Sequence, residues 1–216
     1  MSAIASFALL PKDDFEAFCK LARLVPCNAE SANGRVLSAR MVTEAELKTP
    51  EYRKQQEHHR AVGDYLRNHG TEPFEYQWSG FVISELMGWL KEAKHINLME
   101  NKLEDADEAS SSYIVFNQGT KEKYHAQLDP SNYREDDLAY SFLTFSEAQT
   151  NVAIKQASAK LNEEQLKQFA HMQKTFIQQN ETQFPERGKA MMDGIKIIHQ
   201  CLQLVDDNHV ILLHIG

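Results

Sequence analysis

The pattern of hydrophobic positions is clearest in the last quarter of the chain. Apolar side chains recur there at helical spacing and fall on one face of a helix: Met191, Ile195, Ile198, Leu202 and Val205. A polar break at 206–208 follows, and residues 209–216 then have the composition of a buried β-strand. The C-terminal end of the chain is therefore predicted to belong to the hydrophobic core.

A second apolar run opens the chain. Residues 3–10 predict a strand that is covered on both faces, and Pro11 begins a predicted helix that reaches about Leu24. Because a strand leads into a helix at one end and a helix leads into a strand at the other, we expect the two terminal strands to share one sheet. The sequence thus predicts an α+β fold, in which a small, mostly antiparallel sheet packs against several amphipathic helices.

The middle of the chain mixes helical and extended patterns. Helices are predicted over 50–69, after Ser79, from 144 to about 160, from 163 to about 180 and from 185 onward. Strands are predicted at 36–42 and 113–116, and a strand or an extended lead-in to the next helix at 74–78. Residues 123–128 are predicted to pair back on 113–116 as a hairpin. Residues 100–112 are acidic and small, which predicts an exposed loop. We expect one α+β domain over 1–216, with this loop as the boundary if there are two lobes.

Composition narrows the functional classes. The formal net charge of −8 and the lack of a basic run argue against nucleic-acid binding and favour a partner with a basic surface. The chain has three cysteines, Cys19, Cys27 and Cys201, which are widely spaced and indicate a reducing compartment. The apolar N-terminal run lacks a basic flank and is too short to span a bilayer. We therefore expect a cytoplasmic protein that does not enter a membrane.

The nine histidines do not predict a metal site. His58 and His69 point the same way on one predicted helix, but eleven residues separate them by about 16 Å along its axis. His209 and His214 lie on opposite faces of the predicted last strand, and five residues span about 17 Å there. We interpret these two as boundary histidines that satisfy hydrogen bonds.

Sequence motifs for nucleophilic catalysis and phosphate binding are missing as well. The chain contains no Gly-x-Ser-x-Gly elbow, no phosphate-binding loop that ends in Gly-Lys-Ser/Thr, and no Gly-x-Gly-x-x-Gly turn. The pair Asp105 and Asp107 lacks the glycine and the terminal glutamate of a calcium loop. No cofactor is predicted.

The segment around Trp78 is the leading candidate for a ligand-binding site. Glu75, Tyr76 and Trp78 stand beside a predicted helix N-terminus, where aromatic and acidic side chains can line a pocket. His125, with Asp129, is a further candidate for a site that distant segments complete. The alternative is that these aromatic residues anchor the core where a strand meets a helix.

Three stretches resemble the YfbM-like family, a family of uncharacterised bacterial proteins with a domain of unknown function. They are the opening strand and helix, the step Trp78-Ser79-Gly80 into a leucine-rich helix, and the run from Phe142 through Leu166 before a final helix and strand. Phe145 stands where a proline is common in that family. The resemblance implies a compact α+β fold in a bacterial cytoplasm and supplies no catalytic residues.

Two functional hypotheses remain. The first is a non-enzymatic module that binds another protein or regulates it, for which an immunity-type role would fit. The second is an enzyme whose site is assembled from distant segments around Glu75, Tyr76 and Trp78, with His95 or His125. A pocket where these residues converge on a perturbed titratable group would favour the enzyme.

Overall fold

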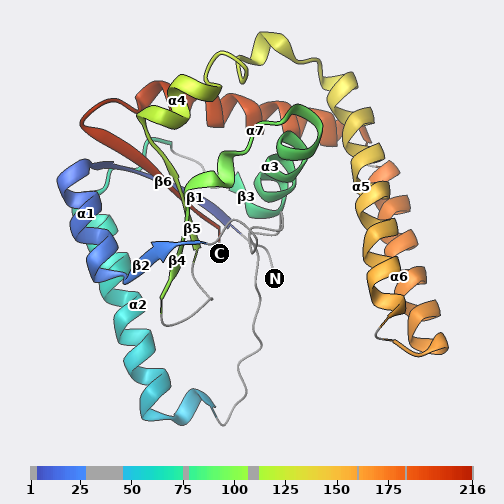
Figure 1. Ribbon diagram of the computed structural model, residues 1–216, viewed down its shortest axis with the longest axis horizontal. Helices are drawn as coiled ribbons and strands as arrows, with labels where there is room; N and C mark the ends of the chain where they lie inside the picture. The colour runs from blue at the N-terminus through green and yellow to red at the C-terminus, as the bar shows by residue number, and fades with distance from the viewer. Residues whose placement is uncertain are drawn as a thin grey trace. The chain divides into compact units, whose positions relative to one another are not determined.

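The computed structural model describes residues 4–27, 46–74, 78–106, 112–159, 161–182 and 184–215 (Figure 1). The chain divides into two compact units. Unit 1 comprises Met1–Leu128 with Ile197–Gly216, and unit 2 comprises Asp129–Lys196. The division therefore falls at Leu128 and Lys196 rather than in the segment 100–112. Whether the two units fold as one domain stays a prediction.

Unit 1 is built on a six-stranded antiparallel sheet with the strand order β2-β4-β5-β6-β1-β3. The strands are β1 (Ile4–Pro11), β2 (Leu24–Pro26), β3 (Trp78–Ser79), β4 (Lys102–Asp105), β5 (Ser112–Phe116) and β6 (His209–Ile215). The first and last strands are direct neighbours, since Ala5 pairs with Ile215 and Pro11 with His209. The prediction of an α+β fold with both terminal strands in one antiparallel sheet is confirmed.

The helices divide between the units. Unit 1 holds α1 (Lys12–Leu21), α2 (Pro50–His69), α3 (Gly80–Lys94) and α4 (Gln118–Tyr124), and short 3₁₀ turns at Glu46–Lys48 and Leu98–Asn101. Unit 2 holds a 3₁₀ turn at Pro130–Asn132, α5 (Glu135–Ser158) and α6 (Glu163–Thr182). The last helix, α7 (Phe184–Leu204), contributes residues to both.

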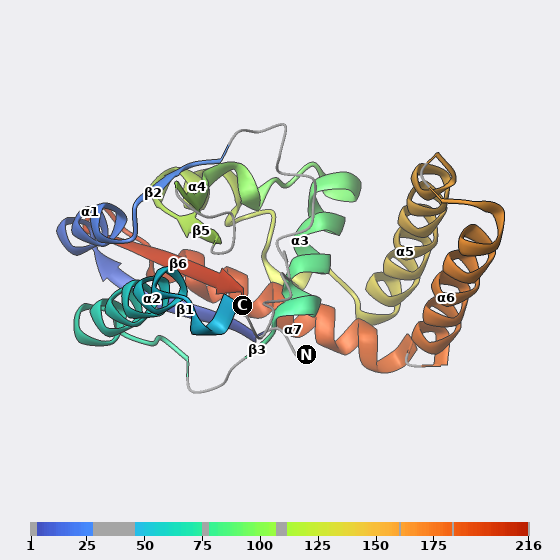
Figure 2. The same ribbon diagram turned by 90° about the horizontal axis from the view of Figure 1, so that it is seen from below.

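One face of the sheet packs against α1 and α2 (Figure 2). Alternate residues of the central strands point to this face, among them Leu10, Val115 and Leu212, and they form one core with Phe18 of α1 and Val62 of α2. Side chains of a strand alternate between faces, so the residues between them point the other way. Those residues are buried too, which explains why β6 has the nearly continuous apolar sequence of a strand covered on both faces.

The turn that leads into β6 is held by one carboxylate. Asp206 accepts hydrogen bonds from the main-chain N–H groups of Asn208 and His209, at 2.7 and 2.8 Å, and from the ring Nδ1 of His209 at 2.9 Å. These bonds, above all the one from Asn208, hold the pKa of Asp206 below its usual value. The polar break at 206–208 is therefore an Asx-type turn that directs the last strand into the sheet.

Unit 2 contains the helical hairpin of α5 and α6. Asn162 caps α6 through a reciprocal pair of hydrogen bonds with Gln165, the capping arrangement that the sequence predicts there. Gly188 of α7 lies against the start of α5, where an added Cβ would overlap the main-chain oxygen of Glu135. A glycine at this position permits the close approach of the two helices.

Three predictions of secondary structure are wrong. Residues 123–128 form no strand, because Asn117 and Thr120 cap each other and open helix α4 instead. Part of the segment 100–112 is not a loop, since β4 pairs with both β2 and β5. Helix α5 begins at Glu135 rather than at 144, and three acidic residues at its first turn favour that start. The predicted strand at 36–42 lies outside the described residues.

Two further expectations concern the cysteines and the membrane. Cys201 is fully buried and Cys19 is half-buried against the core of unit 1, and burial raises the pKa of the Cys19 thiol to about 11. Both behave as small apolar residues. Within the described ranges, no helix combines the length and the apolar character that crossing a bilayer requires. The cytoplasmic location stays a prediction.

The pairing of β6 with β1 and β5 should depend on the buried side chains of β6. Leu213 is completely buried, so Leu213→Ala should lower the free energy of unfolding by about 2–5 kcal/mol, because it removes apolar contacts and leaves a cavity. Leu204→Ala is the matched control, since that side chain is 42% exposed and its loss should cost less than about 1 kcal/mol. Urea unfolding followed by circular dichroism measures both. Equal costs for the two variants would contradict this account of the core.

Candidate functional site

The structure does not assemble the site that the sequence suggests. Glu75 and Tyr76 lie outside the described residues. Trp78 is in the edge strand β3, where its main chain pairs with Ala5. His95 is exposed and has a positive φ of 57°, and Ile96 behind it donates a main-chain hydrogen bond to Leu90 that ends α3. His95 therefore has a role in ending a helix.

His125 lies at the end of α4 and packs on another histidine. Its ring stacks on that of His199 from α7, with the centroids 4.2 Å apart and the planes at 23°. His199 is nearly buried, and its Nε2 lies 3.1 Å from Nε2 of Gln203. Lys121 of α4 also donates hydrogen bonds to the carbonyls of Gln203 and Val205 at the end of α7. The contacts of His125 with α7 thus fit a packing role between two helices.

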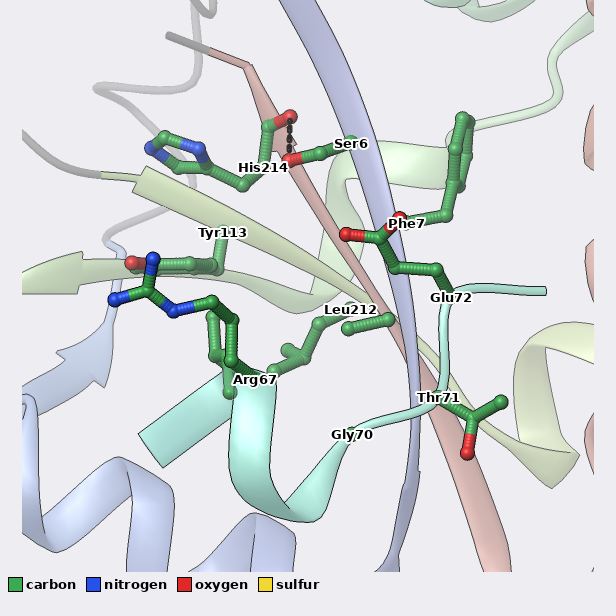
Figure 3. Close-up of a pocket in the computed structure, with 11 residues that line it drawn as sticks. Ser6, Phe7, Arg67, Gly70, Thr71, Glu72, Tyr113, Leu212 and His214 are labelled. Carbon is green, nitrogen blue, oxygen red and sulfur yellow. Dashed lines mark hydrogen bonds between the residues drawn. The ribbon is translucent and has the colours of Figure 1, made fainter. Parts of the chain in front are cut away.

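A pocket of about 400 Å³ lies elsewhere in unit 1, between the sheet and the C-terminal part of α2 (Figure 3). Its apolar wall is made by Ala8, Leu66 and Leu212, which pack on one face of the sheet, and Phe7 of β1 also lines it. Its polar lining comes from three regions: β1 supplies Ser6, the end of α2 and the segment after it supply Arg67, Thr71 and Glu72, and the central strands β5 and β6 supply Tyr113 and His214. This combination of an apolar wall with a few convergent polar groups is typical of small-molecule sites.

The register of the sheet places three of these residues in one row. Ser6 pairs with His214, and His214 pairs with Tyr113, so the three side chains lie side by side across β1, β6 and β5. The rings of Tyr113 and His214 are 4.9 Å apart at 31°. Tyr113 also meets Phe18 of α1 edge to face, at 5.3 Å, which fixes the phenol from the other side. The row is therefore rigid on the side of Tyr113 and open at Ser6, which is exposed.

His214 has an unusual electrostatic environment. Burial lowers its pKa below 6.5, and the nearby His59 of α2 lowers it further. His59 is on the same side of α2 as the core residue Val62, and its buried Nε2 has no hydrogen-bond partner among the described residues. Burial also raises the pKa of Tyr113 to about 12, with a smaller contribution from Asp105. At neutral pH the row thus presents a neutral imidazole and a protonated phenol.

Helix α2 is held in place at the end that borders the pocket. Thr71, just after the helix, exchanges two main-chain hydrogen bonds with Leu9 of β1, at 2.8 and 2.9 Å. On the side of α1, the carboxylate of Asp14 accepts from Tyr65 at 3.3 Å and lies 3.0 Å from Nδ1 of His69. The rings of Tyr65 and His69 stack at 4.1 Å. These contacts fix the position from which Arg67 reaches the pocket.

The charged groups of the pocket lie at opposite ends. Figure 3 shows the guanidinium of Arg67 beside the phenol of Tyr113 and the ring of His214, whereas the carboxylate of Glu72 lies beside Phe7. Arg67 forms an ion pair with Asp64, one turn earlier on α2, and both side chains are at least half exposed. Such an exposed pair is worth little and leaves the guanidinium able to bind another anion.

The arrangement does not form a nucleophile and base of the serine-hydrolase kind. Ser6 Oγ donates at 3.5 Å to the main-chain oxygen of His214 and not to its imidazole. The described parts of the chain also contain no group of three or more His, Cys, Asp or Glu side chains that could hold a metal ion. The pocket offers hydrogen-bond donors and an apolar wall to a ligand.

Sequence reasoning overlooked this pocket because its residues come from distant elements. Ser6 and His214 are 208 residues apart. One signal was present: Val210, Leu212 and His214 point to the same face of β6, so a polar residue follows two core residues on that face. Our interpretation of His214 as a boundary histidine missed that the described elements cover its face only partly.

The comparisons with known proteins give no guide to this site. No protein-family model, no curated protein and no solved structure matches the chain. The resemblance to the YfbM-like family stays a prediction.

The electrostatic link between His59 and His214 should be visible by NMR. In the folded protein His214 should titrate below the usual value of 6.5, and His59→Gln should raise its pKa, because the variant removes the neighbouring group whose charge lowers it. The signal of the ring Cε1–H, followed from pH 8 to pH 4, measures both. His58→Gln is the control, since it changes the adjacent residue and should leave the pKa of His214 unaltered.

The same shift has a consequence for stability. The pKa of such a histidine is lower in the folded state than in the unfolded state, so the unfolded state takes up its proton first as the pH falls. The free energy of unfolding is therefore at its full value above the unfolded pKa and decreases as the pH falls below it. The unfolding free energy of His214→Gln should therefore fall less than that of the wild type between pH 7 and pH 5. An equal fall in both proteins would contradict the burial of His214 in its neutral form.

Proposed function

We propose that this protein is a non-enzymatic binding module, and that the pocket beneath α2 binds a small molecule. The pocket itself is the observation on which this proposal rests: about 400 Å³ of space with an apolar wall and polar groups at both ends. A volume of this order falls in the range of ordinary ligand sites. The absence of a serine–histidine hydrogen bond in the described row favours binding over hydrolysis.

The elements that form the pocket support the same conclusion. The floor belongs to the central strands β1 and β6, which are paired along their whole length. Helix α2 covers this floor, and its end is fixed by the hydrogen bonds of Thr71 with Leu9 and of Tyr65 with Asp14. A pocket between two fixed elements is preformed, so a ligand need not pay the cost of ordering it.

A neutral fluorescent probe can test whether the pocket binds small molecules. We expect N-phenyl-1-naphthylamine to gain fluorescence on binding wild-type protein, because its two aromatic ring systems can contact the apolar wall. Ser6→Phe adds an aromatic side chain at an exposed strand position inside the pocket and should weaken binding by about tenfold or more. The titration is followed by the emission of the probe.

The control for this experiment is Ser158→Phe, the same substitution at an exposed position of unit 2. It should leave the affinity unchanged. If the wild type does not bind the probe, or if both variants lower the affinity equally, the pocket is not a small-molecule site and the proposal fails.

Binding of another protein is a second candidate function, and one surface of unit 2 favours it. Tyr140 of α5 is 69% exposed, although it is a large aromatic residue. Asp136 and Asp137 are also exposed and lie one turn earlier, on the same side of the helix. An exposed tyrosine next to two carboxylates suits a partner with a basic surface, in line with the net charge of −8.

Replacement of this tyrosine should reduce binding of a protein partner. Partners captured from a lysate of the source organism and quantified by mass spectrometry should fall by about tenfold with Tyr140→Ser, because exposed tyrosines often carry a large share of the binding energy. Capture should also fall as the salt concentration rises. Val152→Ser, which changes another exposed apolar residue of α5, should have no effect. Unchanged capture by Tyr140→Ser would exclude this surface.

A further inference from the structure

We propose that the ligand of the pocket beneath α2 carries an oxyanion, such as a carboxylate, sulfonate or phosphate group, which Arg67, Tyr113 and His214 bind together. This inference rests on the proposed small-molecule function and names the class of ligand. Figure 3 shows the three side chains at one end of the pocket, and they come from three different elements, α2, β5 and β6. The apolar wall between this end and Glu72 would hold the remainder of the ligand.

Each of the three side chains can donate a hydrogen bond at neutral pH. The guanidinium of Arg67 has several N–H groups in a plane, which suits the two oxygens of an oxyanion. The phenol of Tyr113 keeps its proton, since burial raises its pKa to about 12. The neutral imidazole of His214 has one N–H, and its other nitrogen can take up a proton. Hydrogen bonds that involve a charged group are about twice as strong as neutral ones.

The charge of the surroundings favours an anion over a cation. His59 of α2 acts on His214, which lies between Tyr113 of β5 and the uncharged Ser6 of β1, and Arg67 of α2 lines the same pocket. The carboxylate of Asp105 on β4 also acts on Tyr113, but it raises the pKa of the phenol less than burial does. The carboxylate of Glu72 lines the pocket beside Phe7, and Asp64 pairs with Arg67 where both are exposed. A metal cation would meet the fixed charge of Arg67.

Binding of an oxyanion should be linked to uptake of a proton. Burial and His59 disfavour the charged form of His214 in the empty pocket. An anion next to the ring would offset both effects and raise the pKa of His214. Affinity for an anionic ligand should therefore increase between pH 7.5 and pH 6, whereas affinity for a neutral ligand of the same shape should not change.

Two probes with the same ring skeleton separate the oxyanion from the apolar contacts. 1-Anilinonaphthalene-8-sulfonate differs from N-phenyl-1-naphthylamine by one sulfonate group. We expect the wild type to bind the sulfonate more tightly than the neutral probe. Arg67→Gln should lower the affinity for the sulfonate probe by about tenfold and leave the affinity for the neutral probe unchanged, because only the charged contact is lost. Inorganic phosphate at millimolar concentration should displace the sulfonate probe and should not displace the neutral probe.

Arg60→Gln is the matched control, since it removes the same charge from an exposed position of the same helix. It should leave the affinities for both probes unchanged, and circular dichroism should show that both variants keep the wild-type fold. The pKa of His214, measured by NMR with and without the sulfonate, gives an independent readout and should rise when the sulfonate binds.

The outcomes separate this inference from the proposed function. If the wild type binds neither probe, the small-molecule function fails, and the oxyanion inference with it. If the neutral probe binds and the sulfonate probe binds no more tightly, the pocket binds small molecules but the oxyanion inference is wrong. The same conclusion follows if Arg67→Gln lowers the affinity for both probes equally. If the sulfonate binds more tightly and depends on Arg67, while the pKa of His214 does not move, His214 is not part of the anion site and the inference is wrong in that respect.

Discussion

The structure of unit 1 depends on the pairing of its first strand with its last. The ladder between β1 and β6 runs from Ala5 opposite Ile215 to Pro11 opposite His209, so it closes a loop of nearly the whole chain. A contact this distant in sequence carries a large entropic cost, which the burial of both faces of β6 must offset. Leu213 is buried on one face and Leu212 on the other, so the ladder connects the two halves of the core.

The pocket follows from the same ladder. Because β1 and β6 are antiparallel neighbours, the start of one lies beside the end of the other, and Ser6 meets His214 there. Helix α2 packs on the central part of this face through Val62 and Leu66. The described elements leave the row of Ser6, His214 and Tyr113 only partly covered. A polar residue at the end of an otherwise apolar strand is thus explained by the limited reach of α2.

The sequence predicted the elements whose signals are local. Thr49 and Pro50 predicted the start of α2, and Thr49 Oγ1 does accept a hydrogen bond from the Tyr52 N–H. The run from Val210 to Leu213 predicted β6, since it combines apolar character with a polar turn before it. One failure occurred where another local interaction competed. The residues around Tyr124 have an extended pattern, but the capping of α4 by Asn117 prevailed.

The pocket could not be predicted in the same way, because its polar residues come from three regions that are far apart in the sequence. Arg67 belongs to helix α2, Tyr113 to β5 and His214 to β6. The three side chains meet only because the strand order is β5-β6-β1. The sequence predicted that β1 and β6 share a sheet but not that β5 is the other neighbour of β6. Had that neighbour been known, the pairing of Tyr113 with His214 would have followed from the register, and with it a buried imidazole beside a phenol. The chemistry of this site is therefore a property of the strand order rather than of any segment.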